Sequence, residues 1–286
     1  MNSDLLQAAR AGDREALLDL FHLQRSNLYR FVYRMLAQPD AVDDILQDVW
    51  VRGQAGIAAF RGDEASLKSW WFRIASNQCL NWLNQRKRWR TDAQLMGEQE
   101  LDNDPEQVEQ FAATMGDPSL RYEAVEHVAF CLSCIGRSLE PSLQAAVFLR
   151  EIFEFSNEEA ARILGLSEPV LRHRLASARA QMAGTFEGLC QLINKTGRCY
   201  QCATLREFAP EDHRGGELVQ IGPAKQVSAV ELAEALLDAR FEIAREANLE
   251  GGGTAALHRL FFTSMGQREE ASGAVFTPPD DAEADV

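Results

Sequence analysis

The 286-residue sequence has no apolar run that approaches the roughly 20 residues a membrane-spanning helix needs. Its first residues, MNSDLLQAARAGD, also lack the charged segment, apolar core and small-residue cleavage site of a secretory signal. These absences predict a cytoplasmic protein without membrane insertion. In a reducing compartment the six cysteines are not expected to form a disulfide framework.

Catalytic groups are equally sparse. The five histidines are scattered along the chain, and no glycine-rich phosphate-binding loop is present. A thiol–disulfide enzyme would need its CxxC pair in a βαβ context, and no such context is expected here. The sequence therefore predicts that the protein is not an enzyme.

Basic side chains are few overall, and their distribution is uneven. The formal net charge is -14, but the segments differ: +3 over residues 1–90, -9 over 91–126, zero over 127–184 and -8 over 185–286. Long-range repulsion between exposed charges is screened beyond about 10 Å at ordinary salt. Local basic surfaces can therefore still meet a polyanion such as DNA.

Apolar residues recur at helical spacing through most of the chain, and no strand is needed to explain the pattern. We predict an all-α fold of two helical domains, residues 1–90 and 119–184. An acidic, flexible linker (91–118) joins them, and a mixed extension with a disordered acidic end (185–286) follows. Within these domains we expect a helix over 67–90 capped by Ser66, and within the extension a helix over 228–248.

The stretch SNEEAARILGLSEPVLRHRLASARAQM (156–182) predicts a helix-turn-helix. Ser156 and Glu159 have the spacing of a capping box, and Gly165 suits a turn with positive φ. Ser167 precedes a second helix whose apolar residues are expected to be buried. Its remaining side chains would face outward into a DNA major groove: Arg172, His173, Arg174, Ser177 and Arg179. An ordinary helical hairpin with a solvated arginine face is the alternative.

Aromatic and basic residues also alternate before position 90. Trp70, Trp71 and Phe72 adjoin Arg73 and Asn77, and further cations follow. Aromatic rings beside cations suit single-stranded nucleic acid, because unstacked bases meet the rings while phosphates meet the cations. The same aromatics would also serve as core residues of an amphipathic helix, so the pattern alone decides little.

Two CxxC pairs, Cys131/Cys134 and Cys199/Cys202, could together hold a tetrahedral zinc ion. The metal would then join the start of the second helical domain to the segment after its end. A thiol redox switch and plain core packing are the alternatives, because i, i+3 cysteines on a helix can be buried as small hydrophobes.

Two longer stretches resemble a known family. DAVDDILQDVWVR, followed by AFRGDEASLKSWWFRIASNQCLNWLNQRKR, resembles region 2 of bacterial sigma factors of the extracytoplasmic-function (ECF) group. LEPSLQAAVFLREIFEFSNEEAARILGLSEPVLRHRLASARAQM resembles their region 4. Two matches in the family's order are more specific than either alone. The resemblance implies that region 2 binds the RNA polymerase core and melts and reads the -10 element, while region 4 reads the -35 element as duplex.

The resemblance also assigns residues to these tasks. Core binding falls to the acidic helix with Asp43, Asp44, Gln47, Asp48 and Trp50. Recognition of the -10 element falls to Arg61, Trp70, Trp71, Arg73, Asn77, Arg86 and Arg88. Recognition of the -35 element falls to Ser167, Arg172, His173, Arg174, Ser177 and Arg179. Implied partners are the core enzyme and promoter DNA, with an anti-sigma factor as a further option. A free-standing helix-turn-helix regulator is the rival interpretation, but it would not need the region 2 stretch.

Overall fold

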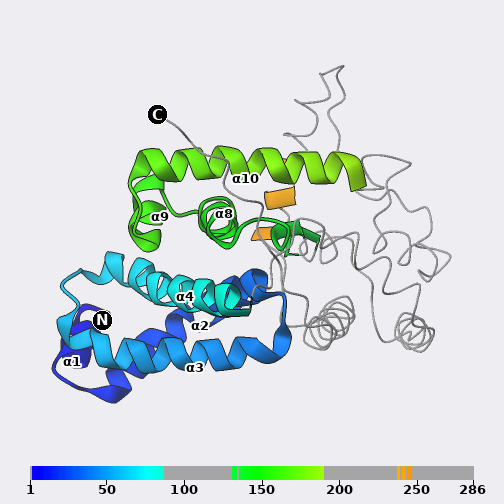
Figure 1. Ribbon diagram of the computed structural model, residues 1–286. Helices are drawn as coiled ribbons and strands as arrows, with labels where there is room; N and C mark the ends of the chain where they lie inside the picture. Colours follow the sequence, from blue (N-terminus) through cyan, green and yellow to red (C-terminus); the bar gives the residue numbers. More distant parts are fainter. Residues whose placement is uncertain are drawn as a thin grey trace, which may run out of the picture.

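The computed structural model describes residues 2–86, 131–133, 135–189, 237–238, 240–242 and 244–245. Regular structure in these ranges is helical, as the sequence predicts (Figure 1). The N-terminal group contains α1 (Asn2–Arg10), α2 (Arg14–Leu36), α3 (Pro39–Gly56), the 3-10 helix η1 (Ile57–Ala59) and α4 (Glu64–Arg86). The second group contains α8 (Pro141–Val147), the π-helix η2 (Phe148–Ile152), α9 (Asn157–Leu164) and α10 (Glu168–Leu189). None of the described helices is long and apolar enough to cross a membrane.

Helix α2 is the central element of the N-terminal group, and local sequence defines both its ends. The Asp13 carboxylate accepts from the N–H groups of Glu15 and Ala16 at 2.9 and 3.1 Å, which caps the first turn. Ala37 ends the helix in the left-handed conformation at φ 46°, and its N–H donates to the Tyr33 carbonyl. One face of the helix is apolar, and these residues on it are all buried: Leu28, Phe31, Val32, Met35 and Leu36.

Helix α4 begins three residues earlier than the sequence suggests. The Asp63 carboxylate accepts from the Ser66 N–H at 2.9 Å and from its hydroxyl at 2.6 Å. The prediction that Ser66 is the cap is therefore wrong: Ser66 lies inside the first turn and donates to the acidic cap before it. Both bonds stabilise the ionised carboxylate and lower the pKa of Asp63, first through the Ser66 hydroxyl.

Helices α3 and α4 pack closely against each other at Gly53. A Cβ built on this glycine would lie 2.0 Å from Cζ3 and 2.2 Å from Cη2 of Trp71. The Trp71 ring is fully buried and packs edge-on against Phe21, with ring centroids 5.1 Å apart. Only a residue without a side chain fits beneath this ring.

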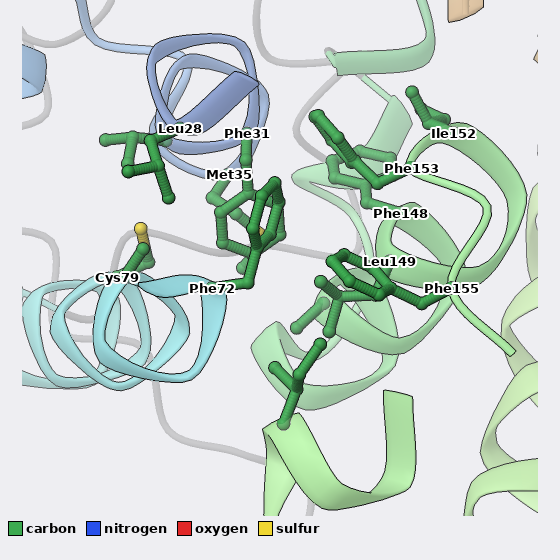
Figure 2. Packing of buried hydrophobic residues seen from close by; sticks show 14 of the residues in the cluster. Leu28, Phe31, Met35, Phe72, Cys79, Phe148, Leu149, Ile152, Phe153 and Phe155 are labelled. Carbon is green, nitrogen blue, oxygen red and sulfur yellow. The ribbon is translucent and has the colours of Figure 1, made fainter. Parts of the chain in front are cut away.

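The two helical groups share one hydrophobic core. Figure 2 shows Phe153 and Phe155, in the turn before α9, beside Phe31 of α2 and Phe72 of α4. The Phe153 ring lies 5.6 Å from that of Phe31 and 5.1 Å from that of Phe72, while Phe155 lies 4.9 Å from Phe72. We call these four rings the aromatic junction.

An unusual backbone path carries the two phenylalanines of this turn to the junction. The Phe153 N–H donates to the Phe148 carbonyl and the Phe155 N–H to the Leu149 carbonyl, both at 3.1 Å. The first bond spans five residues and closes the π-helical turn η2, whereas the second spans six residues. Between the two donors, Glu154 has a positive φ of 57°. A left-handed residue with a Cβ costs about 1–2 kcal/mol. Burial of two phenylalanines, each worth about 1.5–3 kcal/mol, offsets that cost.

The contact at Gly53 predicts an asymmetry between two glycine substitutions. Gly53→Ala should lower the free energy of unfolding by about 1–3 kcal/mol, because the added methyl overpacks the core against Trp71. Gly184→Ala in α10 should raise it by up to about 1 kcal/mol, because a Cβ there meets nothing within 4 Å and alanine favours the helix. Urea unfolding followed by circular dichroism measures both. Equal effects of the two substitutions would contradict the steric account.

Candidate nucleic-acid and partner interfaces

The helix-turn-helix has the geometry that the sequence predicts. The Ser156 N–H donates to the Glu159 carboxylate at 2.8 Å, and the Glu159 N–H donates to the Ser156 hydroxyl at 3.2 Å, so the capping box is complete. Gly165 ends α9 at φ 67°, and the Leu166 N–H donates to the Ala161 carbonyl at 2.8 Å. This turn fixes the start of α10 against α9.

Helix α10 separates into a buried and an outward face. Leu171, Leu175, Ala178 and Met182 are buried, as their spacing predicts. On the other face Ser167, Arg172 and His173 are exposed, while Arg174, Ser177 and Arg179 are half-buried. The Ser167 carbonyl accepts from the Leu171 N–H at 2.9 Å at the start of the helix. A helix with three arginines outside its buried stripe has the form and charge to enter a major groove.

Two arginines on this face are already ion-paired, and the two pairs differ in strength. Arg172 contacts Glu168 at 2.8 Å one turn away, and both side chains are 40% or more exposed. Such a surface pair contributes little and exchanges easily for another anion. Arg179 is only 26% exposed and contacts Glu151 at 3.0 Å and Asp238 at 2.6 Å. Burial opposes the charged form of Arg179, but the two carboxylates outweigh it and raise the pKa of Arg179.

An acidic surface covers the outer side of α3. Asp43, Asp44, Gln47 and Asp48 are exposed, while Val42, Ile45, Leu46 and Val49 on the opposite side are buried. Trp50 is half-buried, with its ring 5.4 Å from that of Phe21. A continuous acidic face with a tryptophan at its edge suits a basic protein partner better than it suits DNA.

The basic and aromatic residues of α4 divide differently from the expectation. Arg73 and Asn77 are exposed, and Trp70 is half-buried. The Trp70 ring is tilted against that of Phe60, with centroids 5.1 Å apart, and packs edge-on against that of Trp71 at 4.7 Å. Trp71 is fully buried, so its ring is not available to a base in this structure, and its contact with DNA stays a prediction. Its neighbour Trp70 takes the outer position because consecutive helical residues lie about 100° apart.

Two arginines shape the loop before α4. Arg61, expected at the -10 element, is exposed and donates to the Ala58 carbonyl at 2.8 Å. Arg10 of α1 donates to the Gly62 carbonyl and lies over the Phe60 ring at 5.3 Å. Sequence reasoning missed Arg10, because nothing in its local context indicates a partner 52 residues away. The side chain of Arg86 and the whole of Arg88 lie outside the described residues.

The cysteine pairs are described only at one position. Cys131 is buried, which agrees with the core-packing alternative. Cys134, Cys199 and Cys202 lie outside the described residues. The zinc site therefore stays a prediction. Cys79 is also buried, and burial raises the pKa of its thiol. A thiol held in this form is a poor nucleophile.

Comparisons with known proteins match both helical groups. The family model described as Sigma-70 region 2 matches residues 20–90, and that described as Sigma-70, region 4 matches residues 130–182. ECF RNA polymerase sigma factor SigM of Mycobacterium tuberculosis (strain Erdman) is 31% identical over 182 residues, which cover 64% of this chain and 83% of SigM. RNA polymerase sigma factor YlaC of Bacillus subtilis is 26% identical over 170 residues, or 59% of this chain and 91% of YlaC.

A solved structure, that of CnrH in complex with the cytosolic domain of CnrY, is similar at 18% identity and a TM-score of 0.46. It covers 65% of this chain and 97% of the matched chain. The family assignment depends on the sequence matches.

The capping box predicts a pH-dependent contribution to stability. The pKa of Glu159 lies below its usual range, mainly because its carboxylate accepts the Ser156 backbone N–H. A lowered carboxylate pKa contributes stability that is present above the unfolded-state pKa and lost as the pH falls through the folded-state value. Glu159→Gln should cost about 0.3–1 kcal/mol at pH 7, and this cost should decrease once the pH falls below the unfolded-state pKa of about 4.3.

Urea unfolding at pH 7 and pH 3.5 measures this difference. The control is Glu158→Gln, whose carboxylate pairs with exposed Arg162 at 2.9 Å and should cost less at pH 7. A cost of Glu159→Gln that is the same at both pH values would contradict the charge-based account.

Proposed function

The chain belongs to the ECF group of the sigma-70 family, and we propose that its two helical groups bind RNA polymerase core and promoter DNA through separate surfaces. The observation that carries this function is the ordered match to regions 2 and 4, together with 31% identity to an ECF sigma factor over most of that protein. As a sigma factor the chain directs the polymerase to promoters. The polymerase carries the chemistry, so we infer no enzymatic activity for this chain.

The domain limits follow the same assignment. We place region 2 in residues 1–90, region 4 in residues 119–184, the acidic linker between them and the extension from residue 185 onward. Each region keeps its own outward-facing polar surface, whereas the buried sides of both groups meet at the aromatic junction. Partner binding is therefore assigned to residues that the fold does not need for packing.

Core binding is assigned to the acidic face of α3. Asp43, Asp44, Gln47 and Asp48 are exposed and lack a packing role, and Trp50 offers an aromatic edge beside them. Asp43 contacts Arg25 only at 4.0 Å between two exposed side chains, so the pair leaves the carboxylate open to another cation. A basic helix of the core enzyme fits this surface by charge.

Recognition of the -10 element is assigned to α4 and the loop before it. Arg61, Arg73 and Asn77 are exposed, and Trp70 presents part of its ring on the same side of the helix. Bases released from the duplex can stack on such a ring while cations meet the phosphates. Trp71 supports this surface from beneath, because its buried ring packs against Trp70.

Recognition of the -35 element is assigned to α10. Arg172, His173 and Arg174 come one to two turns after the N-terminus of the helix, where a recognition helix contacts base edges. Ser167 precedes the helix, and Ser177 and Arg179 continue its polar face toward the flanking phosphates. The net charge of -14 opposes tight binding by the free chain, while the core enzyme supplies further DNA-binding surface.

Run-off transcription on genomic promoters tests the function directly. The free chain should bind duplex DNA weakly and without strong sequence preference, yet it should direct purified core polymerase to specific start sites. Filter binding or fluorescence anisotropy measures the first property, and the run-off products measure the second. Tight, sequence-specific binding by the free chain without any effect on the polymerase would favour a free-standing regulator instead.

Paired substitutions test the division between the two surfaces. Arg172→Ala with Arg174→Ala should reduce transcription according to the -35 sequence, because each lost base contact is worth about 1–3 kcal/mol. Asp43→Ala with Asp44→Ala should weaken core binding equally at every promoter. Arg14→Ala, at an exposed site on α2, is the control for loss of a positive charge. The same promoter-dependent defect in both pairs would show that the assignment is wrong.

A further inference from the structure

A segment of the extension, residues 237–245, contacts both helical groups. Its described residues are helical, with Leu237, Arg240, Phe241 and Ala244 buried and Asp238 and Glu242 exposed. Buried positions three or four residues apart form one face of a helix. Figure 1 shows the segment, in orange, beneath α10. The sequence predicts a helix here but gives no sign of its partners.

Two arginines of α2 bind the C-terminal part of this segment. Arg34 donates to the Ala244 carbonyl at 2.6 Å, and Arg30 donates to the carbonyls of Ala244, at 3.4 Å, and Arg245. Hydrogen bonds from a charged guanidinium to carbonyl oxygens are stronger than those between neutral groups. Region 2 therefore supplies cations where the segment presents acceptors.

The other side of the segment is bound by region 4. Arg245 donates through Nε to the Glu151 carbonyl at 2.7 Å and lies 3.8 Å from the Glu154 carboxylate. Arg179 donates to the Asp238 carboxylate at 2.6 Å, and its guanidinium lies 5.7 Å from the centre of the Phe241 ring. The C-terminal end of the segment therefore contacts η2 and the turn after it, through Arg245. Its N-terminal part contacts α10, through Asp238 and Phe241.

These contacts occupy a side chain that DNA would need. Asp238 presents a carboxylate to the guanidinium of Arg179, which is how a phosphate would meet an arginine. With Glu151 on its other side and Phe241 over its face, Arg179 cannot reach outward to a duplex without leaving the segment.

The distance between promoter elements also conflicts with the packed arrangement. The -10 and -35 elements are about 25 base pairs apart by their positions, or ~85 Å of B-form DNA at about 3.4 Å per base pair. Here α4 and α9 belong to one core, with Phe72 and Phe155 in ring contact at 4.9 Å. Regions 2 and 4 must separate before each can lie on its own element.

We propose that residues 237–245 form an intramolecular clamp that holds the free sigma factor closed, with Asp238 binding Arg179 in place of DNA. This inference rests on the proposed -35 role of α10. Binding of the core enzyme, which engages both regions, would release the clamp and let the regions separate. The extension thereby acts as an inhibitor of DNA binding that is part of the same chain.

The clamp is suited to reversal because it buries a charge. Arg34 is fully buried, and burial lowers its pKa to about 9, with the nearby Arg30 adding to the effect. The guanidinium remains charged at neutral pH and depends on the carbonyls of the segment for part of its solvation. Release of the segment lets water replace these carbonyls, which lowers the cost of opening.

Two substitutions with opposite charge changes test the clamp on the full-length chain. Asp238→Lys removes the Arg179 pair and repels that arginine, and Arg245→Ala removes the contacts to Glu151 and Glu154. Both should tighten binding to a 40-base-pair mixed-sequence duplex about fivefold or more. The apparent Kd equals the intrinsic Kd of the open form divided by the fraction of open molecules, and both variants should raise that fraction. Both should also increase the radius of gyration measured by small-angle X-ray scattering.

The charge changes make the outcome specific. Arg245→Ala removes a positive charge, so an effect of charge alone predicts weaker DNA binding, whereas clamp release predicts tighter binding. Glu242→Lys is the matched control for Asp238→Lys, because Glu242 is exposed on the same segment and forms no ion pair among the described residues. Circular dichroism confirms that each variant is folded.

Each result decides for or against the clamp. The clamp is wrong if Asp238→Lys and Glu242→Lys gain DNA affinity equally. In that case Arg245→Ala should bind DNA more weakly and the radius of gyration should not change. Run-off transcription with core polymerase separates this failure from failure of the proposed function. If the wild-type chain directs specific initiation but the variants show no opening, the sigma-factor assignment holds and the clamp is wrong.

Discussion

The rest of the structure depends on the contact between four phenylalanine rings. Phe153 and Phe155 insert beside Phe31 and Phe72, so that the turn before the helix-turn-helix becomes part of the core of region 2. Gln144 of α8 adds hydrogen bonds of 3.2 Å to the carbonyls of Arg34 and Met35. This junction fixes α9 against α4 and brings Glu151, Arg34 and Arg179 close enough for one short segment to contact all three.

Much of the local structure could be predicted from the sequence, because short-range rules govern it. The capping box at Ser156 and the left-handed turn at Gly165 depend only on residues within one turn of helix. The rules were less decisive where two neighbours could serve the same purpose. Asp63 and Ser66 are both good caps, and Trp70 and Trp71 are both large aromatics, so only packing against Gly53 decides which tryptophan is buried.

The long-range contacts could not be predicted in this way. Arginine is common to DNA-binding surfaces and to structural hydrogen bonding, and here Arg10, Arg34 and Arg179 all bind oxygen atoms of the protein itself. A basic residue on an expected DNA-binding face is therefore not always free to bind DNA. Net charge and local patterning identify candidate cations, but the number available to a phosphate depends on which carbonyls and carboxylates the fold places beside them.

The contacts of Arg30 and Arg34 with Ala244 join residues 214 and 210 positions apart. Domains fold as they leave the ribosome, N-terminal part first, at about 5–20 residues per second. Both helical groups are therefore synthesised before the segment that bridges them exists. For a few seconds each new molecule is a nascent chain with its regions complete and not yet joined by that segment. Closure by this segment can consequently occur only after both helical groups have been synthesised.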